Sequence, residues 1–454
     1  MSRPPLAARL APAARPLGAD PLLSLPARQA LLGRERAGKP TAAAARGHSK
    51  DHRPDLKQLL LILTVSADGA VPLAHRLTDG NTTDDQTHID TWEELVGLVG
   101  EADFLYVADS KLCTREQTSH IDSHGGRFIT VLPRTRKEDS LLRHWLSTDT
   151  PAWREAARRA GKRKGAPEDV WRVAPAPFPT AEGYRIVLVH STVKQRRDEA
   201  TRSERIQRAR RALSELQGRL DGPRCRMTER VAVEEAAAAL LQSLCAERYV
   251  RFTVTEHEQE SFRQEKRGRP GKSTRYRKLT KTRFELDVQI DADAVRYDAA
   301  SDGFFPLTSN DRDLPDADVL RAYRYQPNLE KRHHELKKVQ DAAPVTLKSA
   351  VRIKALFACQ FIALLCDCLT ERELRQAMAR EEISELPLYH EDRACTAPTA
   401  ARVFDAFADL HRHRITHHGE HVQTFDPQLT QLQQQLLGLL GVPESAYAAS
   451  HPGP

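Results

Sequence analysis

The chain lacks the cysteine spacing of a metal-binding or disulfide-bonded framework. Its seven cysteines are scattered over 454 residues, with no Cys-x-x-Cys pair and no accompanying histidine spacing typical of zinc. Cys359, Cys366 and Cys368 fall in an apolar helical run, which predicts reduced thiols packed in a core. The pattern argues against a structural zinc domain and indicates a reducing compartment, the cytoplasm.

A long apolar run is also missing. A helix that crosses a bilayer needs about 20 mostly apolar residues. The stretch Leu356–Leu365 is short and interrupted by polar residues, so it predicts a buried helix of a folded core. We therefore expect no membrane partner.

Residues 1–46 contain little that specifies a fold. Ala, Pro, Arg and Leu dominate, aromatic residues are few, and no helical or strand period is sustained. An Arg-rich, acid-poor start has the composition of an organelle transit peptide. We interpret the segment instead as a disordered or altered N-terminus.

What the chain does have is length and a basic excess. A chain of 454 residues can bury a full core and predicts two or three domains. The formal net charge is +7 and the isoelectric point is near 9.0, a modest excess that suits a polyanionic partner.

After the N-terminal segment the pattern alternates between strands and helices. Leu59–Val65 is apolar on both faces, as in a strand at the centre of a sheet. Asp68-Gly69 is a strong hairpin signal, and Val71–Leu77 is the expected partner strand. The elements expected next are a helix over Asp84–Val99, a strand over Phe104–Ala108, a helix over Thr114–His124 and a strand over Arg127–Leu132.

A long segment of different texture follows, from Arg134 to about Tyr297. We expect two strands, Tyr249–Thr255 and Phe284–Ile290, to flank a mobile basic loop over Gln264–Thr282. The other expected elements are a basic helix over Glu155–Lys164, a strand over Tyr184–His190, a helix over Val193–Leu220 and a helix from about Met227 to Leu244.

Within the basic loop, Lys266 and Arg267 are followed by Gly268-Arg269-Pro270. Arg-Gly-Arg-Pro resembles the core of an AT-hook, an extended element that lies in a narrow minor groove. The alternative is a solvated basic loop that attracts phosphates without regard to base sequence. Both interpretations assign Lys266, Arg267 and Arg269 to DNA contact.

The last third of the chain is expected to be mainly helical. A strand over Phe304–Ser309 precedes a short helix over Leu314–Tyr323. Val351–Leu369 is the longest apolar helix, and a final helix is expected over Asp426–Leu440 before a loose tail.

The segment Tyr323–Lys337 organises our functional prediction. Pro327 fits the first turn of a helix, which places Glu330 in that turn, near the positive end of the helix dipole. Lys337 follows two turns later on nearly the same face. A solvated, charge-laced helix is the alternative interpretation. The neighbouring apolar stripe consists of Leu329, Leu336 and Val339.

The spacing Tyr323, Gln326, Glu330, Lys337 resembles the Y-x2-R-x3-E-x6-K signature of DDE transposases in the insertion-sequence-four superfamily. Gln326 stands where that pattern usually has Arg. Two further blocks, Gly47–Gln58 and Tyr106–Leu112, are also similar to that family, and more narrowly to its branch numbered sixteen-thirty-four. The resemblance covers about residues 47 to 380.

The resemblance implies an α/β fold: a ribonuclease-H-like catalytic core interrupted by a mixed α+β insertion, with a helical C-terminal part. The order hairpin, helix, strand, helix, strand suits such a core. The implied boundaries are an altered N-terminus at 1–46, core at 47–134, insertion at 135–298, core with the signature helix at 299–380, and a C-terminal tail at 381–454.

The resemblance also implies three catalytic acids that hold two Mg²⁺ ions, with Mn²⁺ as a substitute. Asp109 corresponds to the second acid and Glu330 to the third, and both are expected metal ligands. The first acid lies on an early strand in relatives, and the candidate here is Asp20. If Asp20 does not serve, the chain is a catalytically impaired remnant that only binds DNA.

Four further residues are expected to contact DNA phosphates: Tyr323, Lys337, Lys111 and Arg115. For each cation alone, the alternative is a surface charge of little consequence. The function implied is metal-dependent cleavage and strand transfer of an insertion sequence in a bacterial cytoplasm. The expected partner is double-stranded DNA, bound by a homodimer. A stand-alone nuclease is another alternative.

Overall fold

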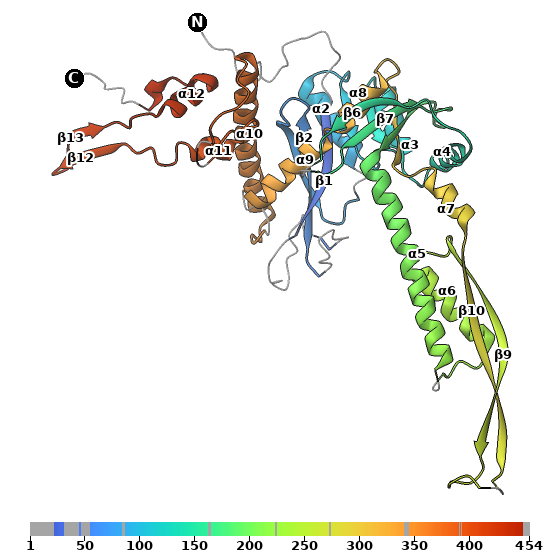
Figure 1. Cartoon of the computed structure of the whole chain (residues 1–454). Coiled ribbons are helices and arrows are strands. Elements are labelled where there is room, and N and C mark those ends of the chain that lie inside the picture. Colours follow the sequence, from blue (N-terminus) through green and yellow to red (C-terminus); the bar gives the residue numbers. More distant parts are fainter. Residues whose placement is uncertain are drawn as a thin grey trace. The chain divides into compact units, whose positions relative to one another are not determined.

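The computed structural model describes residues 22–30, 45–46, 55–83, 87–161, 165–222, 225–271, 274–339, 345–389, 391 and 393–447. The chain divides into two compact units, Met1–Val131 with Thr308–Pro454, and Leu132–Leu307. Both contain helices and strands, so the protein belongs to the mixed α/β class (Figure 1). The predicted insertion, 135–298, falls inside the second unit.

The first unit is built on a mixed sheet with the strand order β3-β2-β1-β4-β5. The strand β1 is antiparallel to β2 and parallel to β4, β4 is parallel to β5, and β2 is antiparallel to β3. The strands are β1 (Leu22–Ala30), β2 (Gln58–Ser66), β3 (Pro72–Asp79), β4 (Leu105–Ala108) and β5 (Arg127–Val131).

The apolar run that predicted a central strand forms β2. Residues Gln58–Val65 are all buried, as expected for a strand covered on both faces. The predicted turn is present: Gly69 has a φ of +79°, and the Ser66 hydroxyl donates to the Asp68 carbonyl at 2.9 Å. The hairpin prediction is therefore confirmed.

Two helices connect the strands of this sheet. The helix α2 (His88–Val99) buries Trp92 and Leu95 and ends at Gly100, whose φ is +89°. The helix α3 (Arg115–Ser123) is capped by Thr114, whose side chain accepts from the Gln117 backbone N–H. Both helices were predicted, to within a few residues.

The N-terminal prediction is wrong in part. Residues 1–46 were expected to be disordered or altered, but the structure has β1 at Leu22–Ala30, between β2 and β4. Strand formation here depends on two neighbours far along the chain, whereas the local sequence has no clear period. Most of the Gly47–Gln58 block lies outside the described residues.

The signature segment forms two short helices and a π-helical turn. The helix α8 (Asp316–Tyr323) packs on β4 and β5, and α9 (Gln326–His334) packs on β1 and β2 (Figure 1). The π-helical turn spans Glu335–Val339. Leu329 and Leu336 are fully buried, so the predicted stripe does dock on the core. Because α9 begins at Gln326, Glu330 lies in its second turn instead of the first.

A buried ion pair fixes α9 against the hairpin and the next helix, α10 (Ala350–Arg380). The Arg332 guanidinium donates to the carbonyls of Gly69 (2.9 Å) and Ala70 (3.2 Å) and to the carboxylate of Glu371 (2.9 Å). Arg332 and Glu371 are each 3% exposed. Burial alone would raise the pKa of Glu371, but the charge of Arg332 and its hydrogen bond lower the pKa overall.

The helix α10 extends the predicted Val351–Leu369 helix by eleven residues at its C-terminal end. By length and composition alone Val351–Arg380 could cross a membrane, and 22% of its most apolar window is buried. The expectation of core thiols is wrong for Cys359 and Cys366, which are exposed. Cys368 is buried, and burial raises the pKa of its thiol to about 12.

In the C-terminal part, the helix expected over Asp426–Leu440 is confirmed as α12 (Gln431–Leu440), and it packs on the core. Leu436 of the final helix packs with Leu374 and Ala377 of α10 in one buried cluster. An unpredicted hairpin precedes that helix. The elements are α11 (Ala400–Asp405), β12 (His413–His417), β13 (Glu420–Phe425), α12 (Gln431–Leu440) and the 3₁₀ turn Glu444–Ala446.

The second unit contains a sheet with the strand order β11-β8-β7-β6. The prediction of a basic helix over Glu155–Lys164 is wrong, because Arg154–Arg159 forms β6, paired antiparallel with β7. Tertiary pairing overrides local propensity there. The other elements are β7 (Asp169–Pro175), β8 (Arg185–Ser191), β11 (Phe304–Ser309), α4 (Lys137–Thr148) and α7 (Ala292–Ala299).

A two-stranded ribbon packs on two helices in the same unit. The helices are α5 (Thr192–Asp221) and α6 (Arg230–Ser243), and the ribbon pairs β9 (Val250–Gln264) with β10 (Tyr276–Ile290) in antiparallel register. These strands are about twice as long as predicted, so part of the expected loop over 264–282, chiefly residues 276–282, is strand. The alternating sequence of the ribbon is too polar to signal a strand without its partner.

Candidate functional site

Asp109 directly follows β4 and is held by the turn that begins there. Its carboxylate accepts a hydrogen bond from the Lys111 backbone N–H at 2.9 Å. Its backbone carbonyl accepts from the Leu112 N–H at 3.1 Å and from the Thr130 hydroxyl on β5 at 2.6 Å. Asp109 is half-buried. The neighbouring strand thus fixes the backbone from which this carboxylate projects.

Glu330 lies on the solvent side of α9. Leu329, the residue before it, is fully buried, while Glu330 is exposed. Among the residues that the structure describes, neither Glu330 nor Asp109 forms an ion pair with a cationic side chain. Two carboxylates without a neutralising cation are chemically suited to a metal ion.

The pKa of Tyr323 responds to both acids. Burial raises the pKa of the Tyr323 phenol, and the negative charges of Asp109 and Glu330 raise it further, to about 12. A charge acts on a partly buried phenol in this way only from nearby, because solvent screens distant charges. Asp109 and Glu330 are far apart in sequence, yet the charge of each raises the pKa of the same phenol.

The predicted phosphate-binding cations differ in exposure. Lys111 is exposed in the turn after β4, and Arg115 is exposed at the first position of α3. Lys337 is half-buried within the π-helical turn. The sequence placed Lys337 two regular turns after Glu330, but a π turn adds a residue per turn and changes its direction. Gln326 is half-buried at the start of α9.

Asp20, the predicted first catalytic acid, lies outside the described residues. The strand β1 that follows it reads Leu-Leu-Ser-Leu-Pro-Ala-Arg-Gln-Ala and has no acidic residue. In the parallel pairing of β1 with β4, Ser24 is level with Ala108, one residue before Asp109. The position on β1 nearest the end of β4 is thus occupied by a hydroxyl residue.

In the second unit, Lys266, Arg267 and Arg269 lie in the turn between β9 and β10. All three are exposed. They remain predicted DNA contacts.

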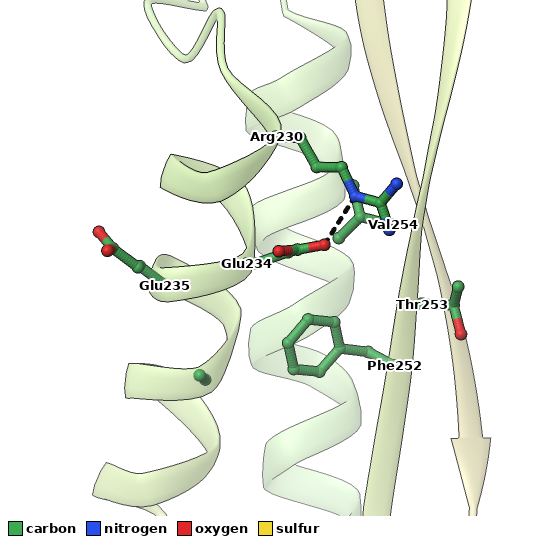
Figure 2. A pocket seen from close by; sticks show the side chains of 7 residues that line it. Arg230, Glu234, Glu235, Phe252, Thr253 and Val254 are labelled. Atoms are coloured by element: carbon green, nitrogen blue, oxygen red, sulfur yellow. Dashed lines mark hydrogen bonds and ion pairs between the residues drawn. The ribbon is translucent and has the colours of Figure 1, made fainter.

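The described residues offer no third metal ligand beside Asp109 and Glu330. Within the described ranges, no group of three His, Cys, Asp or Glu side chains is placed to hold a metal ion. An open hollow of about 460 Å³ lies between α6 and β9, and Arg230 pairs there with Glu234 at 2.7 Å. Figure 2 shows this pair beside Phe252. None of the predicted site residues lines the hollow. A smaller hollow of about 180 Å³ includes Trp153 and His190.

Two positioning residues were missed at the sequence level. Thr130 holds the Asp109 backbone, and nothing in a strand's own sequence marks such a contact. Arg332 was detectable, because it lies three residues after Leu329 and four before Leu336, on the buried stripe of the helix. A charged residue on such a stripe indicates a buried partner.

The resemblance to DDE transposases rests on the sequence motifs alone. Neither a family model nor a curated protein sequence matches this chain.

Proposed function

We propose that this chain is a DDE-type transposase, which cuts and joins DNA ends with a divalent metal ion. The observation that supports it most is that Asp109, directly after β4, and Glu330, on α9, both raise the pKa of the half-buried Tyr323 phenol. These are the residues that the motif resemblance assigns as the second and third acids. The reaction would take place on double-stranded DNA in the bacterial cytoplasm, with a homodimer holding two DNA ends.

The strand order supports a ribonuclease-H-like core. The first three strands form an antiparallel meander, and β1 then pairs in parallel with β4, and β4 with β5. Asp109 lies at the carboxyl end of β4, where ligand-binding groups of α/β sheets are commonly placed. The two helices α8 and α9 lie against the same sheet and present Tyr323 and Glu330.

The donor set fits a hard divalent cation. Asp109 and Glu330 would hold Mg²⁺, with two ions expected and Mn²⁺ as a substitute. When bound, such ions polarise the phosphodiester and stabilise the attacking and leaving oxygens. The raised pKa keeps the Tyr323 phenol protonated at neutral pH, so that it can donate to a phosphate oxygen. Lys111, Arg115 and Lys337 would hold the DNA backbone.

A second candidate function follows from β1. Because this strand has no carboxylate beside the end of β4, the site has two described acids where the resemblance implies three. A chain with two acids would bind DNA and a metal ion yet cut slowly or not at all. This candidate is the catalytically impaired remnant.

The test is nicking of supercoiled plasmid and joining of labelled DNA ends in Mg²⁺. We expect the unaltered chain to cut, and Glu330→Gln to be inactive. The matched control is Glu116→Gln, an exposed acid on α3 that should leave cutting unchanged. Equal cutting by Glu330→Gln would contradict the assignment. An inactive parent that still binds DNA would favour the remnant, and cutting without joining would indicate a nuclease.

A further inference from the structure

The outer half of the β9–β10 ribbon extends away from the core of its own unit. We define the distal ribbon as residues 258–264 of β9 and 276–282 of β10. The buried cluster on α5 and α6 includes Val254 and Phe284 and stops there. Beyond it, every residue of the distal ribbon is exposed or half-buried. Figure 1 shows the ribbon continuing past the ends of both helices.

The distal ribbon and the turn between its strands carry a dense positive charge. Residues 258–282 contain nine lysines and arginines against three glutamates, a surplus of six. Such a surplus on one protruding element indicates a polyanion partner.

The strand register places three of these cations on one face of the ribbon. Arg263 is directly opposite Arg277, and Lys281 is directly opposite Gln259. Because side chains alternate along a strand, these residues share one face of the ribbon. The other face has Glu258 and Glu260. We call the face with Arg263, Arg277 and Lys281 the cationic face.

No acid neutralises the cationic face. In the described part of the chain, none of its three cations forms an ion pair, whereas Lys278 on the other face pairs with Glu260 at 2.5 Å. Arg283, nearer the core, donates instead to the carbonyls of Leu220 and Gly222 at the end of α5. Like charges directly opposite each other destabilise a ribbon. Repulsion between Arg263 and Arg277 therefore destabilises the ribbon, and a bound anion would offset that repulsion.

We propose that the distal ribbon binds duplex DNA by placing its cationic face in the major groove. Two strands lie about 4.8 Å apart, so a ribbon with its side chains fits a groove about 12 Å wide. Residues two apart on one face are separated by about 6.8 Å, the rise of two base pairs. Arg277 and Lys281 are then spaced by about four base pairs, and the turn with Lys266, Arg267 and Arg269 reaches the adjoining backbone.

The dimensions favour DNA over other polyanions. The major groove of duplex RNA is deep and narrow and does not admit a ribbon. An acidic protein surface would satisfy the charge but not the regular spacing. The inference deepens the proposed function by assigning part of its DNA contact, but binding is measured without metal and does not depend on cleavage.

The experiment measures binding of the full chain to a labelled 20-base-pair duplex in EDTA, across a range of salt concentrations. We expect Arg263→Gln, Arg277→Gln and Lys281→Gln together to weaken binding at least tenfold. The slope of log affinity against log salt should fall by at most about 2.7, the value for three cations that each neutralise one phosphate at the edge of the groove. The matched control removes three exposed arginines of α5, Arg205, Arg210 and Arg211, and should weaken binding much less.

A second variant separates binding from folding. Arg277→Glu places a favourable opposite charge beside Arg263, so thermal stability should stay the same or rise while DNA affinity falls. Unchanged DNA affinity in either ribbon variant, or an equal loss in the α5 control, would overturn the proposal. So would equal affinity for duplex RNA, or displacement of DNA by polyglutamate at equal charge. None of these measurements depends on cleavage activity.

Discussion

At the residue scale, the decisive group is a phenol. Burial and two carboxylates act in the same direction on Tyr323 and raise its pKa to about 12. The phenol therefore remains a hydrogen-bond donor at every pH at which DNA chemistry would be assayed. The charges of Asp109 and Glu330 make its environment negative, which would favour a bound cation.

Replacing Tyr323 by Phe removes that donor and keeps the ring. We expect cleavage by Tyr323→Phe to fall by about 10- to 100-fold, the effect of losing one hydrogen bond to a charged group. The activity profile from pH 7 to 10 should keep its shape, because the phenol does not ionise in that range. Plasmid nicking at matched enzyme concentration measures both. A profile that changes shape in the variant would contradict this role.

The Arg332–Glu371 pair predicts a specific dependence of stability on pH. The pKa of Glu371 is lowered in the folded protein, so its stabilising effect is present above its ordinary pKa and is lost as the pH falls through the lower, folded value. At pH 7, Glu371→Gln should lower the free energy of unfolding by about 3 kcal/mol, because Arg332 keeps a buried charge.

Urea unfolding at pH 7 and at pH 3 to 4 measures this effect. The gap between the variant and the parent should shrink at the lower pH, because the unfolded parent then binds a proton on Glu371 that the folded parent binds only below its lowered pKa. The control is Glu373→Gln on the same helix, an exposed partner of Arg372 whose loss should change stability by less than about 0.5 kcal/mol. A gap that widens in acid would refute the assignment.

At the element scale, the turn between β2 and β3 anchors α10. Gly69 has a φ of +79°, and a Cβ there would lie 3.0 Å from the Cβ of Arg372. Gly69→Ala should therefore lower the free energy of unfolding by more than about 1 kcal/mol. Gly97→Ala, in the helix α2 with open space around it, should raise it by about 0.5 kcal/mol. Thermal unfolding of both variants tests this, and equal effects would contradict it.

The elements differ in how far their own sequence specifies them. The strand β2 and the helix α5 were predictable, because an unbroken apolar run and a long charged helical pattern are local signals. The strands β1 and β6 were not, because each depends on pairing with strands that are distant in sequence or on an edge. The ribbon was half predicted: its apolar root was recognised, while its polar outer half was interpreted as loop.

The same division holds for the candidate site. Asp109 was identifiable from its place after a buried strand, and Glu330 from its spacing to Tyr323 and Lys337. Their common effect on the Tyr323 phenol could not be predicted from the sequence, because it depends on how α8 and α9 pack on the sheet. The π-helical turn, which changes the direction of Lys337, has no recognisable sequence signal.

At the scale of the whole molecule, the two units carry different chemistry. In the first, two carboxylates raise the pKa of one phenol, and in the second, residues 258–282 carry nine cationic residues against three acids. DNA binding and metal binding should therefore be separable by mutation. This separation allows each proposal to fail without the other.

The central claim is that Asp109 and Glu330 form one metal site, and Mn²⁺ binding followed by electron paramagnetic resonance tests it most directly. We expect the parent to bind Mn²⁺, and Asp109→Asn, Glu330→Gln and the double variant to lose the same binding, because one site needs both acids. Glu116→Gln should bind as the parent does. Full Mn²⁺ binding by either single variant would contradict the account.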